Sequence, residues 1–180
     1  MKNNNTNRIW RVTVYSLLLC VAGFITGCAS PAQQPTMTKV QSPPPVDKLL
    51  KANDILFSAL GQVGIPYRYG GSTPDSGFDC SGLIQYVYAA SANIKLPRTV
   101  AGMYRIDAPV VDEDKLQAGD LVIFATGWGD RPSHAGIYVG EGRFVHAPSS
   151  GGAVRMDYLS EEYWQRSYLN AKRPLAALDQ

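Results

Sequence analysis

The chain has 180 residues, of which 45% are hydrophobic and 18% are charged, so it suits one globular domain and not a disordered or collagen-like chain. The formal net charge of +2 depends on Lys2, Arg8 and Arg11, because the first 27 residues contain no acid. Without these three, the 17 basic residues fall to 14 against 15 acidic ones, a net charge of −1. This balance disfavours a basic nucleic-acid-binding protein, and we expect no nucleic-acid partner.

The first 27 residues have the pattern of an export signal. Residues 1–11 are polar and basic, and residues 12–27 form an uncharged apolar run that is shorter than the roughly 20 residues of a membrane span. The run ends in Ile25-Thr26-Gly27-Cys28, which resembles a bacterial lipobox, the signal in which the cysteine carries lipid such as palmitate. Since Ala29 follows, the resemblance implies a periplasmic, lipid-anchored protein of a Gram-negative outer membrane. The alternative is a plain signal peptide or membrane anchor with a chance cysteine.

The next segment is predicted to be a tether. Five prolines fall among Gln, Ser and Thr in residues 29–46, and such a segment cannot bury a core. We therefore divide the chain into a signal peptide at 1–27, a tether at 28–45 and a folded domain at 46–180. With Cys20 removed and Cys28 lipidated, Cys80 is the only cysteine left, so no disulfide framework is expected in the domain.

Helical periodicity comes first in the domain and short apolar runs follow. The predicted helices cover Asp47–Val63 and Cys80 to about Asn93, on either side of a turn-dense loop at 67–78. Residues 94–118 give no clear pattern. Strands are predicted at Leu121–Phe124, Ala135–Val139, Arg143–Ala147, Ala153–Tyr158 and Leu169–Arg173, with a helical turn at Ser160–Arg166 capped by Ser160. This order predicts an α+β fold, with N-terminal helices packed on an antiparallel sheet.

Cys80 falls at the start of the second predicted helix. Asp79 is a good N-cap, and the helix dipole at its first position should lower the pKa of the Cys80 thiol. Gly82, in the first turn, would let another backbone approach closely. The alternative is a capped amphipathic helix whose inward residue happens to be a cysteine.

Both histidines of the chain lie on one predicted hairpin. A three-residue loop at 140–142 would pair 139 with 143, 138 with 144 and 136 with 146, and would leave His134 diagonal to His146 on one face. A two-residue loop would put the histidines on opposite faces, so an odd loop or a bulge is required. With Cys80 as nucleophile, His134 would be the general base and His146 would orient its imidazole.

Six segments together resemble the NlpC-type cell-wall cysteine peptidases, in order and spacing. They are Tyr67–Gly71, Phe78–Leu83, Leu96–Arg98, Ala118–Val122, His134–Gly140 and Phe144–Ala147. The resemblance covers essentially all of residues 50–175 and implies a papain-like α+β fold. It also implies a catalytic triad of Cys80, His134 and His146 that hydrolyses amide bonds in peptidoglycan stem peptides or crosslinks.

The resemblance and the local chemistry suggest four further site residues. Tyr67 matches a family tyrosine near the nucleophile, and its hydroxyl could support the oxyanion together with the Cys80 N–H. Asp79 and Ser81 flank the nucleophile and could shape the substrate groove. Arg98, like Arg68, could meet stem-peptide carboxylates. We expect a monomer with no metal and no cofactor, whose partners are peptidoglycan and, through lipid on Cys28, the membrane.

Three other functions remain open from the sequence alone. The same triad could serve a papain-like amidase or acyl transferase. One thiolate and two imidazoles could instead hold zinc, although no C-x-x-C pair is present. The chain could also be a cell-wall-binding lipoprotein without activity, against which the intact Cys, His and His argue.

Overall fold

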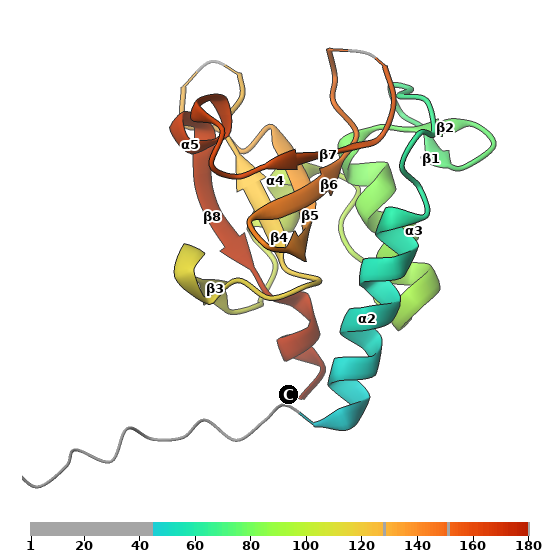
Figure 1. Ribbon diagram of the computed structural model, residues 1–180, viewed down its shortest axis with the longest axis vertical. Helices are drawn as coiled ribbons and strands as arrows, with labels where there is room; N and C mark the ends of the chain where they lie inside the picture. The colour runs from blue at the N-terminus through green and yellow to red at the C-terminus, as the bar shows by residue number, and fades with distance from the viewer. Residues whose placement is uncertain (1–44, 128, 151, 180) are drawn as a thin grey trace, which may run out of the picture. The chain divides into compact units, whose positions relative to one another are not determined.

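The computed structural model describes residues 45–127, 129–150 and 152–179 (Figure 1). The predicted signal peptide, Cys28 and all of the predicted tether except Pro45 lie outside the described residues. Within those ranges, no helix is long and apolar enough to cross a membrane.

In the described residues, two main helices precede the sheet. The first is α2 (Val46–Leu60), which ends three residues earlier than predicted, at the Gly61 C-cap. The second is α3 (Cys80–Ala92), which ends at Asn93 in the left-handed conformation, with φ of 56°. The remaining helical segments are α4 (Val100–Tyr104), α5 (Glu162–Ser167) and the 3₁₀ turns η1 (Glu113–Lys115) and η2 (Pro174–Asp179).

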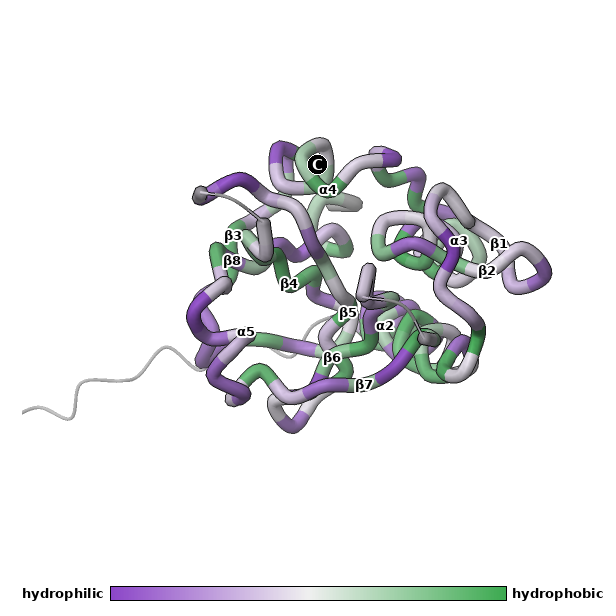
Figure 2. The backbone as a smooth tube through the Cα atoms, turned by 90° about the horizontal axis from the view of Figure 1, so that it is seen from above, coloured by the Kyte–Doolittle hydropathy of each residue, from purple (hydrophilic) through white to green (hydrophobic). Residues whose placement is uncertain are grey.

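The central sheet has six antiparallel strands in the order β3-β8-β4-β5-β6-β7 (Figure 1). Their bounds are β3 Val110–Val111, β4 Leu121–Phe124, β5 His134–Gly140, β6 Arg143–His146, β7 Arg155–Tyr158 and β8 Tyr168–Lys172. A separate pair, β1 (Ser72–Thr73) and β2 (Gly77–Phe78), lies inside the predicted turn-dense loop, and the tip between these strands is hydrophilic (Figure 2). The predicted α+β class with an antiparallel sheet is confirmed.

The β5–β6 hairpin has the pairing that the histidines require. Tyr138 pairs with Phe144 and Ile137 with Val145, as predicted, but Gly140 and not Val139 pairs with Arg143. The connection is therefore a two-residue turn with a bulge beside it, which restores the register that a three-residue loop would give. Glu141 and Gly142 in this turn both have positive φ, 54° and 70°, as tight hairpin turns need.

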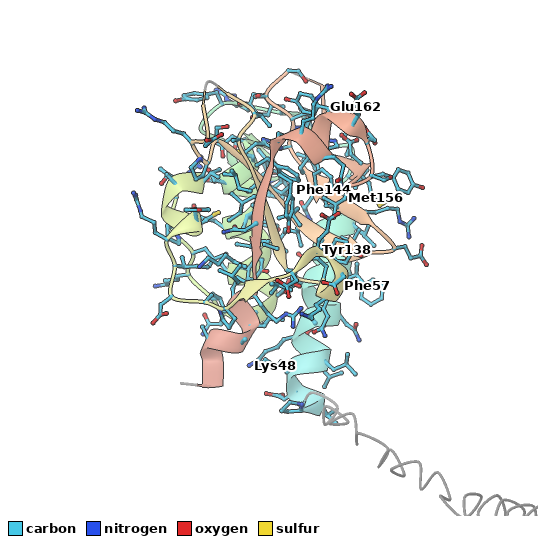
Figure 3. All side chains as sticks on the ribbon, turned by 90° about the vertical axis from the view of Figure 1, so that its left-hand side faces the viewer. Lys48, Phe57, Tyr138, Phe144, Met156 and Glu162 are labelled. Carbon is cyan, nitrogen blue, oxygen red and sulfur yellow. The ribbon has the colours of Figure 1, made fainter. Side chains whose placement is uncertain are left out.

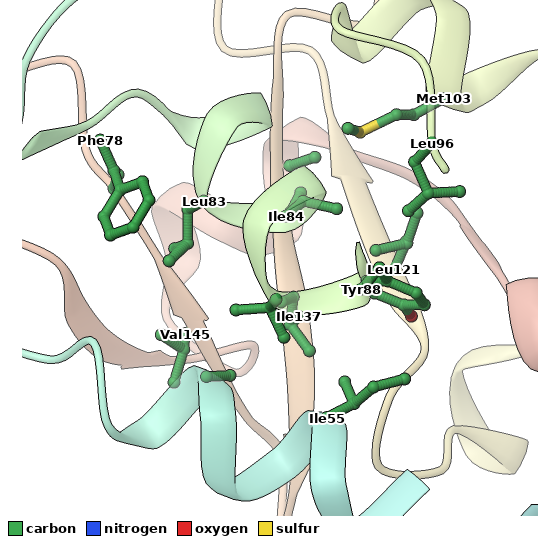
Figure 4. Packing of buried hydrophobic residues seen from close by; sticks show 14 of the residues in the cluster. Ile55, Phe78, Leu83, Ile84, Tyr88, Leu96, Met103, Leu121, Ile137 and Val145 are labelled. Atoms are coloured by element: carbon green, nitrogen blue, oxygen red, sulfur yellow. The ribbon is translucent and has the colours of Figure 1, made fainter. Parts of the chain in front are cut away.

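The sheet is covered on both faces. The larger core lies between the helices and the sheet, where Leu83 and Ile84 of α3 face Ile137 and Val145 (Figure 4). A smaller core on the other face packs under α5, and Figure 3 shows Phe144 below Glu162, the first residue of α5. Its buried members are Val111, Val122, Phe124, Phe144, Leu159, Trp164 and Ala171.

The predicted cap of α5 is wrong. The N-cap is Glu161, without a capping side-chain bond, and the helix begins at Glu162. Ser160 lies in the turn that leaves β7, and Glu161 closes that turn by accepting the Tyr158 N–H at 3.1 Å. Trp164 of this short helix is buried in the smaller core.

Candidate active site

Asp79 holds the start of α3 and the preceding loop together. Its Oδ1 accepts the Gly82 N–H at 2.7 Å, which makes it the predicted N-cap, and its Oδ2 accepts the Gly70 N–H at 2.9 Å. The loop runs so close to the helix that a Cβ on Gly82 would lie 2.0 Å from the carbonyl oxygen of Gly71. The predicted close backbone approach at Gly82 is confirmed, and it places Cys80 as the first residue of α3.

The Cys80 thiol does not have the lowered pKa that its position predicted. Burial raises the pKa of Cys80, and the neighbouring Asp79 carboxylate raises it further. The N–H groups of Ser81 and Ala135 lower the pKa, but by less than burial and the carboxylate raise it. The expectation from the helix dipole was wrong because it left out desolvation and the charge of the N-cap itself.

The two histidines form a hydrogen-bonded pair. His134 Nε2 lies 2.9 Å from His146 Nδ1, and the rings are perpendicular, with centroids 5.0 Å apart. His134 begins β5 and His146 ends β6, so the predicted juxtaposition on one face of the hairpin is confirmed. Burial lowers the pKa of His134 to about 3 and that of His146 to about 4, so both imidazoles are neutral at pH 7.

Asp157 on β7 is hydrogen-bonded to His146 of this pair. The sequence analysis did not predict its place in the site. Its Oδ2 lies 3.0 Å from His146 Nε2 and accepts the indole N–H of Trp164 at 3.2 Å. The Arg155 guanidinium donates to both oxygens of the same carboxylate. One signal was available, since Asp157 is the only acidic residue between His146 and Ser160.

A cleft brings together the predicted catalytic and substrate residues except His146, which is fully buried behind His134. Cys80, His134, Tyr67, Asp79, Ser81 and Arg98 all line it. The backbone N–H of Ala135, next to His134, is close enough to Cys80 to lower the pKa of its thiol, so β5 and the start of α3 adjoin at the cleft. A second hollow shares His134 and Ser149 with this cleft and extends to Arg155 and Tyr163. His134 therefore stands where the two hollows meet.

The two arginines that the sequence singled out are placed differently. The guanidinium of Arg98 donates to both Asp79 oxygens and to Ser81 Oγ, so it is bound within the cleft wall. Arg68 is exposed and does not line the cleft. Tyr67 does line it, and burial together with the nearby Cys80 and Asp79 raises the pKa of its hydroxyl, which stays protonated at neutral pH.

The part of the chain that the structure describes contains no group of three His, Cys, Asp or Glu side chains that could hold a metal ion. His146 uses both ring nitrogens in hydrogen bonds, to His134 and Asp157. The arrangement offers instead a thiol, a neutral imidazole chain ending in a carboxylate, and hydrogen-bond donors around one cleft. These are the parts that nucleophilic attack on a carbonyl carbon requires.

Comparison with known proteins places the chain in a family. The model of the NlpC/P60 family matches residues 64–173. The murein DD-endopeptidase MepH of Escherichia coli is 44% identical over 128 residues, which cover 70% of this chain and 47% of MepH. The probable endopeptidase NlpC of Escherichia coli is 33% identical over 163 residues, which cover 88% of this chain and 98% of that protein.

A solved structure agrees with these matches. It is the crystal structure of an NlpC/P60 family protein from Bacillus cereus, with a TM-score of 0.62 and 31% identity over 69% of this chain and 40% of that one. The chain spans less than half the length of MepH and of the Bacillus cereus protein, so the likeness to these two concerns one domain. The chain belongs to the NlpC/P60 family.

Proposed function

We propose that the protein is a cysteine peptidase that hydrolyses amide bonds in peptidoglycan stem peptides or crosslinks. The observation that carries the proposal is the meeting of Cys80 and His134 at one cleft, with the buried His146 hydrogen-bonded to His134. The names of the relatives support the substrate class, since MepH is called a murein DD-endopeptidase and NlpC a probable endopeptidase.

In the proposed reaction, Cys80 is the nucleophile and His134 the general base. Since burial keeps the thiol protonated and the imidazole neutral, the proton passes from Cys80 to His134 as sulfur attacks the carbonyl carbon. His134 then gives that proton to the leaving amine, and a thioester remains on Cys80. Water activated by His134 hydrolyses the thioester and releases the shortened peptide.

The oxyanion of the tetrahedral intermediate needs donors near Cys80. The Cys80 N–H at the start of α3 and the protonated hydroxyl of Tyr67, which lines the cleft, are the candidates. Asp79, Ser81 and Arg98 would form the adjoining wall of the substrate groove. Because Arg98 is already paired with Asp79, we assign it to shaping that wall and not to binding a substrate carboxylate on its own.

The first experiment incubates the purified full chain, in detergent, with isolated sacculi and separates the products by chromatography with mass detection. Cys80→Ser is the matched control. Crosslinked dimers converted to monomers by the wild type alone would mean cleavage of the crosslink, and stems ending at D-glutamate would mean cleavage within the stem. If no product depends on Cys80, the proposal is wrong and a cell-wall-binding lipoprotein becomes the better interpretation.

Single variants separate the proposed roles. Cys80→Ala and His134→Ala should remove turnover while the circular dichroism spectrum stays unchanged. His146→Ala should lower kcat less, by roughly 10²-fold, because an orienting group is partly replaceable. Full activity in His146→Ala would contradict its place in the triad.

We also propose that the chain is anchored to the periplasmic face of an outer membrane through lipid on Cys28. The lipobox-like segment ending at Cys28 supports this, and the Pro-rich residues after it would let the domain reach the cell wall. Labelling with a palmitate analogue tests the anchor, because Cys28→Ala should lose both the label and the membrane fraction. Retention of label in that variant would contradict the assignment.

A further inference from the structure

We propose that Asp157 is a positioning residue that holds both histidines in the one tautomer that leaves Nδ1 of His134 free to take a proton. The inference rests on the proposed function, because it concerns the proton acceptor of that reaction. It comes from the chain of hydrogen bonds that runs from β7 through β6 to β5.

Asp157 sets the direction of the hydrogen bonds in this series. A carboxylate can only accept hydrogen bonds, so the contact of Asp157 Oδ2 with His146 Nε2 requires the proton on that nitrogen. The hydrogen bonds that Asp157 receives from Arg155 and His146 help to hold the pKa of its carboxyl below the usual range, although burial acts the other way. The carboxylate is therefore ionised at neutral pH and serves only as an acceptor.

The direction of the hydrogen bond between His134 and His146 follows from the number of protons on the two rings. A neutral His146 carries one ring proton, and with that proton on Nε2 its Nδ1 is an acceptor. The 2.9 Å contact then requires His134 Nε2–H to be the donor, which leaves Nδ1 of His134 without a proton. Among the ring nitrogens of the two histidines, this is the only one without a hydrogen-bond partner in the described part of the chain.

The surroundings of Asp157 demand a carboxylate and not an amide. Four N–H donors from three residues converge on it: His146 Nε2, Trp164 Nε1, and Nε and Nη2 of Arg155. Its side chain is only 11% exposed, so water does little to replace these bonds. Trp164 also packs on both imidazoles, with its ring 5.5 Å from that of His134 and 4.9 Å from that of His146, which limits how far the rings can turn.

Replacing Asp157 with Asn tests this arrangement, because an amide offers one acceptor oxygen to these donors where the carboxylate offers two. With the amide oxygen in the place of Oδ1, where it accepts from Arg155 Nε, the NH₂ group takes the place of Oδ2 and donates to His146 Nε2. That change moves the proton of His146 to Nδ1 and the proton of His134 to its own Nδ1, where it blocks acceptance from Cys80. The expected result is a fall in kcat on the order of 10²–10⁴-fold with little change in KM.

The decisive readout is the ¹⁵N NMR spectrum of the imidazoles in the full chain. Only two histidines are present, so His146→Gln assigns all remaining signals to His134. In the wild type, both Nε2 atoms should have shifts of the protonated type and both Nδ1 atoms shifts of the unprotonated type. A wild-type spectrum with a proton on Nδ1 of His134 would overturn the proposal, whether or not any variant folds.

Asp120→Asn is the matched control. Asp120 is also buried, at 1% exposure, and also pairs with an arginine, Arg173, at 2.8 Å, but it does not contact either histidine. It should lose stability without changing the imidazole shifts. Unchanged shifts in Asp157→Asn, or the same shift changes in Asp120→Asn, would reduce Asp157 to a structural residue. If the tautomers are as expected but the wild type cleaves no sacculi, the proposed function fails while the tautomer assignment stands.

Discussion

Asp79 and Arg98 form a two-point ion pair at the wall of the cleft, with Nη1 2.8 Å from Oδ1 and Nη2 2.7 Å from Oδ2. The same carboxylate caps α3 through the Gly82 N–H, and Arg98 also donates to Ser81 Oγ at 2.7 Å. One pair thus ties the segment before α4 to the residues on both sides of Cys80.

Arg98→Ala should loosen the cleft wall. Since 40% of the Arg98 side chain is exposed, solvent screening limits the expected loss of unfolding free energy to about 1 kcal/mol. The pKa of Asp79 is lowered in the folded state, chiefly by Arg98 acting against burial, so its contribution is present above pH 4 and is lost as pH falls through the folded pKa. Urea unfolding at pH 7 and at pH 3 checks this, because the loss should be larger at pH 7.

Arg166→Ala is the control for that measurement. Arg166 pairs with Glu162, but both side chains are mostly exposed, at 68% and 81%. Such a pair contributes little, so this variant should unfold like the wild type at both pH values. An Arg98→Ala protein as stable as Arg166→Ala would mean that the two-point pair with Asp79 is not stabilising.

The Cys80 thiol should react as a protonated thiol across the neutral range. Burial and Asp79 raise its pKa, and burial keeps His134 neutral, so no thiolate–imidazolium pair forms at rest. The rate at which iodoacetamide alkylates Cys80 can be followed by mass detection at several pH values. This rate should still be rising at the pH where the alkylation rate of a small free thiol, measured alongside, reaches half of its maximum. A plateau of fast alkylation between pH 5 and pH 8 would contradict this and restore the lowered pKa expected from the helix dipole.

The position of Cys80 could be predicted from the sequence, but the pKa of its thiol could not. Its place at the start of a capped helix depends on Asp79 and Gly82, which are its chain neighbours. The juxtaposition of His134 and His146 was predictable for the same reason, because side chains alternate along a strand and a short turn limits the possible registers. The pKa of the Cys80 thiol depends mainly on its burial in the folded protein. That burial could not be predicted from the residues next to Cys80 in the sequence.

The elements that escaped prediction depend on contacts distant in the chain. Strand β3 has two residues and exists through its pairing with β8, some 60 residues later. Asp157 reaches His146 because β7 pairs with β6 in one register, with His146 opposite Arg155. The eight residues between these strands, 147–154, include Pro148 and two glycines, and their sequence alone leaves that register open.

The histidine pair should make stability depend on pH between pH 7 and pH 5. Burial lowers the pKa of both imidazoles in the folded state, so the unfolded chain binds more protons once pH falls below about 6.5. Stability is therefore highest above the unfolded pKa and falls on acidification, by at most about 1.4 kcal/mol per pH unit for each histidine. Urea unfolding at several pH values measures the slope.

His146→Gln removes one of these two groups and should reduce the slope. The depressed carboxyl pKa values of Asp79 and Asp157 act below about pH 4, so they do not contribute in this window. Stability that stayed constant from pH 7 to pH 5 in the wild type would mean that neither imidazole has a lowered pKa in the folded state.

Gly82→Ala should disrupt the site through its backbone. The added Cβ would lie 2.0 Å from the Gly71 carbonyl oxygen and 3.1 Å from Asp79 Oδ1, and a carbonyl in the main chain cannot rotate away as a flexible side chain can. The loop at Gly71 must therefore move off α3, which breaks the approach that Asp79 and Arg98 hold in place. We expect a loss of at least about 2 kcal/mol in unfolding free energy and a large loss of turnover on sacculi.

Gly127→Ala provides the comparison for that variant. The nearest atom to its added Cβ is Ser133 Oγ at 3.7 Å, an ordinary van der Waals contact, so its unfolding free energy should stay within about 0.5 kcal/mol of the wild type. Urea unfolding of both variants, with turnover measured on the same preparations, tests the difference. A Gly82→Ala protein as stable and as active as Gly127→Ala would show that the loop at Gly71 can retreat from α3 without cost, and that the close approach does not position Cys80.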